Sequence, residues 1–221
     1  MRFRDRREAG KALAKELGKY ANLGDVLILA LPRGGVPVAF EVATALRAPL
    51  DVFVVRKLGL PGHEELAMGA IASGGVRVIN EDVVRYLHIP ESIIDAVAAI
   101  EERELERREG MYREGRSALA VGGRKVILID DGLATGSTMR VAVQSLRQRH
   151  PARIVVAVPV APPSTCEYFR HEVGECVCVL EPAMLDGVSR WYEDFSQTTD
   201  EEVSELLEQA REAEQAAFSA R

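Results

Sequence analysis

One stretch carries most of the information about this fold: Arg124-Lys125-Val126-Ile127-Leu128-Ile129-Asp130-Asp131-Gly132-Leu133-Ala134-Thr135-Gly136-Ser137-Thr138. It starts as a short apolar run rich in β-branched residues, passes through two acids and two glycines, and continues to residue 149 with helical periodicity. That order predicts a buried strand, a loop and a helix. In an open parallel sheet, ligands bind beyond the carboxyl ends of the strands, where loop N–H groups and a helix N-terminus favour an anion. The stretch therefore predicts an anion site at the end of this strand.

The loop after this strand has the residue types that a phosphate group needs. Two glycines allow unusual backbone angles and a close approach of the main chain to a ligand, and three hydroxyl groups can donate to phosphate oxygens or cap the helix. These residues are Gly132, Thr135, Gly136, Ser137 and Thr138. A Walker A loop is excluded because no lysine follows Gly136. The ordinary alternative is a βα turn with an Asp-Gly corner.

Two adjacent carboxylates, Asp130 and Asp131, precede this loop. They would repel a phosphate unless they faced neutral hydroxyl groups or a metal shell. Ribose hydroxyl groups meet that requirement. The residues therefore predict a phosphorylated ribose as the ligand.

A second apolar run, 26–30, leads into Leu31-Pro32-Arg33-Gly34-Gly35, and helical periodicity begins at Val36. Alone, Arg-Gly-Gly after a strand is explained by a tight βα turn. Beside the first loop it predicts a second anion site, because the carboxyl ends of parallel strands meet at one edge of a sheet.

Residues 126–138 resemble the signature with which type I phosphoribosyltransferases bind 5-phosphoribosyl-1-pyrophosphate (PRPP): an apolar strand, two acids, Thr-Gly and a second hydroxyl residue. The resemblance implies that Asp130 and Asp131 accept hydrogen bonds from the ribose 2′- and 3′-hydroxyls. It implies that the 5′-phosphate is held by Gly132, Leu133, Ala134, Thr135, Gly136, Ser137 and Thr138. It also implies a pyrophosphate loop at Arg33, Gly34 and Gly35, with a cis peptide bond between Pro32 and Arg33.

Arg56 and Lys57 follow a third apolar run, 50–55, and would lie at the carboxyl edge of the same sheet. Similar enzymes have basic residues here, so the resemblance adds both to the pyrophosphate site. Strand alternation sends the two side chains to opposite faces, and we favour Arg56. The alternative is one solvated cation and one paired with a neighbouring acid.

The acceptor base in this family is chosen by a variable hood over the ribose. An aromatic cluster near 184–195 is the candidate, and its Trp191 and Tyr192 could stack on a base. The same rings could instead anchor the terminal helix to the core. The inserted stretch 63–113 departs from the compact family pattern, so the sequence does not identify the base.

The apolar pattern predicts an α/β fold of the type I phosphoribosyltransferase kind, with a mostly parallel sheet, helices on both faces and a small hood and insert region. We expect one domain, 1–221, with an insert or lid at 59–115 and a C-terminal hood and tail at 181–221. Strands are predicted at 26–30, 50–55, 76–79, 125–129, 154–160 and 176–179, and helices at 6–21, 36–46, 91–113, 138–149 and 199–221. The irregular order of residues 59–75 predicts a mobile loop. His63-Glu64-Glu65 could belong to such a lid and is weak as a metal site.

Composition narrows the class of protein. The 221 residues are 47% hydrophobic and 28% charged, and no apolar run approaches the ~20 residues that cross a bilayer. The N-terminus lacks the apolar core of a secretion signal, so we expect a soluble cytoplasmic protein without membrane partners. A net charge of −6 argues against a nucleic-acid partner.

The three cysteines, an odd number, suit no disulfide framework. Cys176 and Cys178 would share one face of a strand. We expect buried core thiols, with a metal pair as the alternative.

The resemblance predicts transfer of the phosphoribosyl group of PRPP to a nitrogenous base with release of pyrophosphate. Mg²⁺ would be held mainly by PRPP oxygens and water, and no protein metal ligand is expected. A regulatory protein that binds PRPP or a nucleotide without catalysis is the first alternative. The second is a nucleotide-binding module without transferase chemistry, in which the Arg33 loop has no role. A homodimer is expected by resemblance alone.

Overall fold

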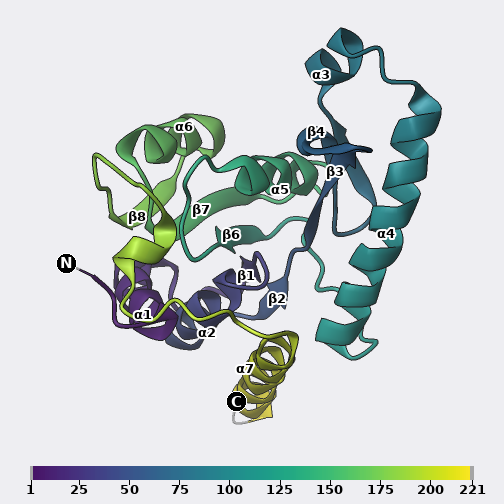
Figure 1. The fold of residues 1–221 in the computed structure, drawn as a ribbon. Coiled ribbons are helices and arrows are strands. Elements are labelled where there is room, and N and C mark those ends of the chain that lie inside the picture. Colours follow the sequence, from purple (N-terminus) through teal and green to yellow (C-terminus); the bar gives the residue numbers. More distant parts are fainter. Residues whose placement is uncertain (1, 220–221) are drawn as a thin grey trace.

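The main sheet has five parallel strands in the order β2-β1-β6-β7-β8 (Figure 1). The computed structural model describes residues 2–219, and all of their side chains except those of residues 64, 65 and 217–219. The strands are β1 (Val26–Ala30), β2 (Leu50–Val52), β6 (Lys125–Ile129), β7 (Arg153–Val160) and β8 (Cys176–Leu180). The predicted α/β class is confirmed, because every pair of neighbours in this sheet is parallel.

Helices cover both faces of this sheet (Figure 1). Alternate residues of β1 and β6 point to opposite faces of the sheet and belong to two different hydrophobic cores. Residues of α1 and α2 contribute to the core on one face, and residues of α5 and α6 contribute to the core on the other. The helical elements that flank these strands in the chain are α1 (Arg6–Glu16), η1 (Gly18–Tyr20), α2 (Gly35–Leu46), α5 (Ser137–Arg147), α6 (Pro163–Val173), η2 (Val188–Trp191) and α7 (Asp200–Ser219). The continuous apolar runs of the sequence are therefore strands buried on both sides.

A second sheet stands beside the first at the β2 edge (Figure 1). It is antiparallel, in the order β3-β4-β5, with β3 (Val55–Leu60), β4 (His63–Ala72) and β5 (Val76–Ile79). The helices α3 (Glu81–Tyr86) and α4 (Glu91–Arg113) follow it, and α4 packs along β3 and β4.

Two sequence expectations fail in this region. The predicted loop over 59–75 is a β-hairpin, and the predicted strand over 50–55 is divided between β2 and β3. Glycine misled the first prediction: Gly62 has a φ of 79° in the hairpin turn, and a Cβ on Gly69 would lie 2.3 Å from the Val78 carbonyl oxygen. These glycines permit a turn and a close strand pair instead of breaking the strands. The side chains of Glu64 and Glu65, assigned to a lid, lie outside those described.

The end of α4 is tied to β2 by a buried ion pair. Arg113 Nε donates to Asp51 Oδ1 at 2.8 Å, and the two residues are 8% and 5% exposed. Arg113 also donates to the Val52 carbonyl oxygen at 2.9 Å and lies 3.0 Å from Glu109. The Leu119 N–H completes the shell of the Asp51 carboxylate. Because the pair is buried, removal of either partner would leave an uncompensated charge and destabilise the fold more than the loss of a surface pair would.

The expectation that no disulfide forms is wrong. Cys166, at the first turn of α6, is bonded to Cys178 on β8. The prediction failed because the sequence spacing gives no sign that α6 folds back over β8. Cys176 stays a free buried thiol, as expected. Across residues 2–219 we find no helix whose length and apolar character would let it cross a membrane.

Candidate functional site

The two predicted anion loops lie side by side. Strands β1 and β6 are paired so that Ala30 faces Ile129, the last residue of each strand. The Leu31 N–H then donates to the Ile129 carbonyl oxygen at 2.8 Å, which joins the starts of the two loops. Both loops therefore leave the carboxyl edge of the sheet at one place, as a parallel α/β site requires.

Glycine lets the two loops touch. A Cβ on Gly34 would lie 2.1 Å from Asp131 Oδ2, and one on Gly35 would lie 2.8 Å from the Ile129 carbonyl oxygen. The peptide bond between Pro32 and Arg33 is cis, as the resemblance implied. The main chain at Gly34 and Gly35 is thus packed against the acid pair, with no room for a side chain at either position.

We expect Gly34→Ala to lower the free energy of unfolding by about 1–3 kcal/mol, because the new methyl group displaces a carboxylate that Arg6 holds in place. Gly18→Ala is the control, since nothing lies within 4 Å of a Cβ at that position. Urea denaturation of both variants measures the difference. Equal free energies of unfolding for the two variants would show that the loops can accommodate a methyl group at position 34 without loss of stability.

Asp130 and Asp131 share a desolvated place at the end of β6. Burial raises the pKa of Asp130 well above its ordinary value, and the neighbouring charge of Asp131 raises it further. Burial also raises the pKa of Asp131, while a hydrogen bond from Arg6 opposes that shift. Hydrogen bonds donated by a ligand to the ionised carboxylates would offset this cost of burial.

Arg6 is a site residue that the sequence analysis missed. Its Nε donates to Asp131 Oδ2 at 2.8 Å, and another guanidinium nitrogen donates to the Ser196 carbonyl oxygen at 2.7 Å. The guanidinium also stacks 3.9 Å from the centre of the Phe195 ring. Arg6 therefore joins α1, the acid pair and the segment before α7, and no local motif marks it.

The loop after the acids has the geometry of an anion cradle. Gly136 takes a φ of 70° just before α5, and Thr135, Ser137 and Thr138 are exposed. The Leu133 N–H is held by the Val160 carbonyl oxygen at 2.9 Å. The Thr135 hydroxyl donates weakly to Ser137 Oγ at 3.4 Å. These exposed hydroxyl groups lie at the N-terminus of α5, where an anion is favoured.

Arg33 lies at the other side of the site and is partly exposed. Its guanidinium is 3.8 Å from Asp200, the first residue of α7. Tyr112 of α4 donates a hydrogen bond to the same carboxylate. Asp200 is therefore a weak, partly exposed partner of the Arg33 guanidinium. A more highly charged anion bound at this loop would replace Asp200 as that partner.

Arg56 and Lys57 do not lie where the sequence placed them. Because β2 ends at Val52, both residues belong to β3 of the second sheet and not to the edge of the main sheet. Arg56 is paired with Glu101 of α4 at 2.6 Å, and Lys57 is exposed. Their role in binding pyrophosphate stays a prediction.

Tyr192 anchors the C-terminal segment. It is 4% exposed, packs against Phe3 and Phe195, and donates to the Asp131 carbonyl oxygen at 2.6 Å. A ring enclosed in this way offers no face to a base, so of the two roles considered for Tyr192 the structure supports anchoring. Trp191 is half-buried, and its stacking role stays a prediction.

A parallel sheet with two glycine-rich loops and a carboxylate pair at one edge defines an open α/β protein with a candidate site at the edge where such folds bind ligands. Residues 62–184 match the family model of the phosphoribosyl transferase domain. This chain belongs to the phosphoribosyl transferase domain family. The matched residues include the Asp130 loop and begin after the Arg33 loop.

Relatives of known name agree with this assignment. Two from Mycobacterium tuberculosis, strains H37Rv and CDC 1551, are named "Putative phosphoribosyl transferase" Rv0571c and MT0597. Each is 46% identical over 208 residues, which is 94% of this chain and 47% of the relative. The chain thus spans about half the length of these relatives. The crystal structure of TT1426 from Thermus thermophilus is 43% identical, with a TM-score of 0.81 over 94% of this chain and 98% of that one.

Proposed function

We propose that this protein transfers the 5-phosphoribosyl group of PRPP to a nitrogenous base and releases pyrophosphate. The observation that carries the proposal is the contact between the two loops, in which Gly34 lies against the Asp131 carboxylate. A ligand spanning this contact meets an anion loop at each end and two acids between them. PRPP has that order of groups: a phosphate, ribose hydroxyls and a pyrophosphate.

Each part of the site has a role in this proposal. Residues 132–138 hold the 5′-phosphate through backbone N–H and hydroxyl groups. The carboxylates of Asp130 and Asp131 accept hydrogen bonds from the ribose 2′- and 3′-hydroxyls. Arg33 and the N–H groups of Gly34 and Gly35 bind pyrophosphate. The binding energy of both ends is used to place C1 of the ribose.

The reaction needs no covalent bond to the protein. The lone pair of a base nitrogen forms the new bond to C1 while the bond between C1 and the pyrophosphate oxygen breaks. Positive charge develops on the ribose ring, and the departing charge is stabilised by Arg33. Asp130 and Asp131 keep the ribose oriented during the displacement.

Mg²⁺ fits this site as a partner of the substrate. The carboxylates of Asp130 and Asp131 offer the hard oxygen atoms that this ion prefers, but Asp131 is already engaged by Arg6. We therefore assign the ion chiefly to PRPP oxygens and water, where it would neutralise pyrophosphate charge. We also propose residues 59–115 as a lid, Trp191 as part of the hood, and a homodimer as the working assembly.

The direct test is to incubate the protein with PRPP, Mg²⁺ and a panel of purine and pyrimidine bases, and to measure pyrophosphate. We expect release with at least one base. PRPP binding without release from any base would support a regulatory protein instead. No PRPP binding would overturn the proposal.

Arg33→Ala should lower kcat by about 10²-fold or more, because a charged donor to the departing group is lost. Arg153→Ala is the matched control: Arg153 also pairs with an acid, Glu175, but lies at the start of β7 on the opposite edge of the sheet. We expect the control to keep full activity. Unchanged binding and turnover in Arg33→Ala would favour a nucleotide-binding module in which this loop has no role.

A further inference from the structure

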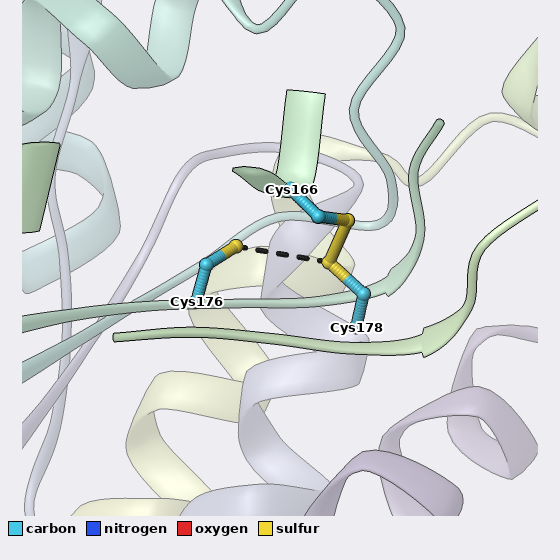
Figure 2. Close-up of side chains that lie close together, drawn as sticks. All are labelled: Cys166, Cys176 and Cys178. Atoms are coloured by element: carbon cyan, nitrogen blue, oxygen red, sulfur yellow. Dashed lines mark hydrogen bonds between the residues drawn. A yellow bond between two sulfur atoms is a disulfide. The ribbon is translucent and has the colours of Figure 1, made fainter. Parts of the chain in front are cut away.

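Three cysteines converge behind the phosphate loop. Cys166 comes from the first turn of α6, and Cys176 and Cys178 come from the same face of β8 (Figure 2). Their sulfur atoms all lie within 4.8 Å of one another. Cys166 and Cys178 form a disulfide, and the Cys176 sulfur lies 3.7 Å from that of Cys178. The bond fastens α6 to the edge strand of the sheet.

The fastened turn of α6 is also the part that supports the loop. Thr165, the neighbour of Cys166, donates its hydroxyl to the Ala134 carbonyl oxygen at 3.0 Å. Phe169, one turn further on, lies so close that a Cβ on Gly136 would be 2.8 Å from its ring. These two side chains therefore support the loop from the α6 side, together with the Val160 carbonyl oxygen that accepts from the Leu133 N–H.

We propose that Cys166 and Cys178 are a reversible thiol modification site whose disulfide state sets the affinity of the neighbouring loop for the 5′-phosphate. The proposal rests on the proposed function for the identity of the ligand. With the bond formed, Thr165 and Phe169 are held against the loop. With it reduced, the first turn of α6 moves more freely, and the loop must be ordered when the ligand binds.

Reduction requires a dithiol. One thiolate of the dithiol attacks the Cys178 sulfur, which is the more accessible of the two because Cys166 is fully buried. The disulfide bond breaks, and Cys166 leaves as a thiolate and takes up a proton. The second thiol of the reductant then displaces Cys178, so one disulfide is reduced and one is formed.

Cys176 does not compete for this bond. Burial raises the pKa of its thiol to about 12, so near neutral pH it carries a proton and is a poor nucleophile. Arg170 is the basic group that faces it, Glu181 is the acidic one, and they act in opposite directions on that pKa. The thiol that lies beside the disulfide is therefore a bystander, which makes it a useful control.

The experiment compares the full chain in oxidised glutathione and in dithiothreitol. Alkylation and mass spectrometry count free thiols, calorimetry measures the Kd for PRPP, and hydrogen exchange follows residues 132–138. We expect one free thiol in the oxidised protein and three in the reduced protein. Reduction should weaken PRPP binding by about 5-fold or more and speed exchange in the loop.

Variants separate the pair from the bystander. Cys178→Ala should have the weaker affinity in both buffers, and Cys166→Ala should match it if it folds. Cys176→Ser should keep the redox response of the parent protein. An effect of Cys176→Ser equal to that of Cys178→Ala would overturn the assignment of the pair.

Failure of this inference is distinct from failure of the proposed function. Three free thiols in oxidised glutathione, or equal PRPP affinity and equal loop exchange in both buffers, would overturn the inference and leave the function standing. A metal ion found bound to the three thiols by elemental analysis would also overturn it. Faster loop exchange on reduction in a protein that does not bind PRPP would sink only the proposed function.

Discussion

Replacing both Asp130 and Asp131 by asparagine is expected to weaken PRPP binding by roughly 10²-fold or more. Each carboxylate accepts a charge-assisted hydrogen bond from a ribose hydroxyl in the proposed complex, and such a bond contributes about 1.5–3 kcal/mol. Calorimetric titration of PRPP measures the change. Asp25→Asn is the control, because Asp25 precedes β1 at the opposite edge of the sheet. Unchanged affinity for PRPP in the double variant would show that Asp130 and Asp131 do not bind the ribose.

The same double variant should also lose less stability than the parent protein as the pH rises from acid to neutral. Folding raises the pKa of both acids above the ordinary value of 3.8, so the folded state binds their protons more tightly than the unfolded state. The contribution of these two groups to the free energy of unfolding is therefore most favourable below pH 3.8 and is lost as the pH rises through the folded-state pKa values. Asparagine removes this loss.

Urea denaturation from about pH 4 to pH 8, without ligand, tests that sign. The parent protein should lose stability from these two groups over the range, and the double variant should lose less. Asp25→Asn should change the pH dependence in the opposite direction. A hydrogen bond from Lys125 lowers the pKa of Asp25 in the folded protein, so ionised Asp25 adds stability as the pH rises, and asparagine removes that gain. Identical pH profiles of the parent and the double variant would show that the acid pair is not under strain.

Arg113→Met is expected to lower the free energy of unfolding by about 3–5 kcal/mol. The Asp51 carboxylate is 5% exposed and would be left with backbone N–H donors only. A buried carboxylate without its counter-ion keeps the cost of desolvation and loses the compensating attraction. Because this pair ties α4 to β2, the loss should appear as global destabilisation.

Arg107→Met is the matched control on the same helix. Arg107 also forms an ion pair, with Glu104 at 2.8 Å, but its side chain is 56% exposed. A pair so open to solvent contributes about 0–1 kcal/mol. Guanidinium denaturation of the two variants should separate them clearly, and equal losses would mean that burial does not set the weight of the Arg113 pair.

Much of the fold could be predicted from local patterns. Strands 26–30 and 125–129 and helix 91–113 match the observed elements, because continuous β-branched runs and helical periodicity are local properties of the chain. The juxtaposition of the Arg33 and Asp130 loops also followed from sequence, since parallel strands bring their carboxyl ends to one edge. The hairpin β3–β4 was missed because glycine is read locally as a breaker, whereas here it relieves contacts with partner strands.

The residues that complete the site had no local signal. Arg6 meets Asp131 across 125 positions of sequence, and Tyr192 reaches the same residue from the C-terminal segment. Asp200 approaches Arg33 only because α7 packs against α2 and α4. The partner of Cys178 likewise depended on how α6 lies over β8.

The order of residues along the chain was enough to predict two anion loops and an acid pair, because the functional groups of each loop come from consecutive residues. The neighbours that set the charge and rigidity of those loops were decided by tertiary structure, since long-range packing selects among many side chains of equal local character.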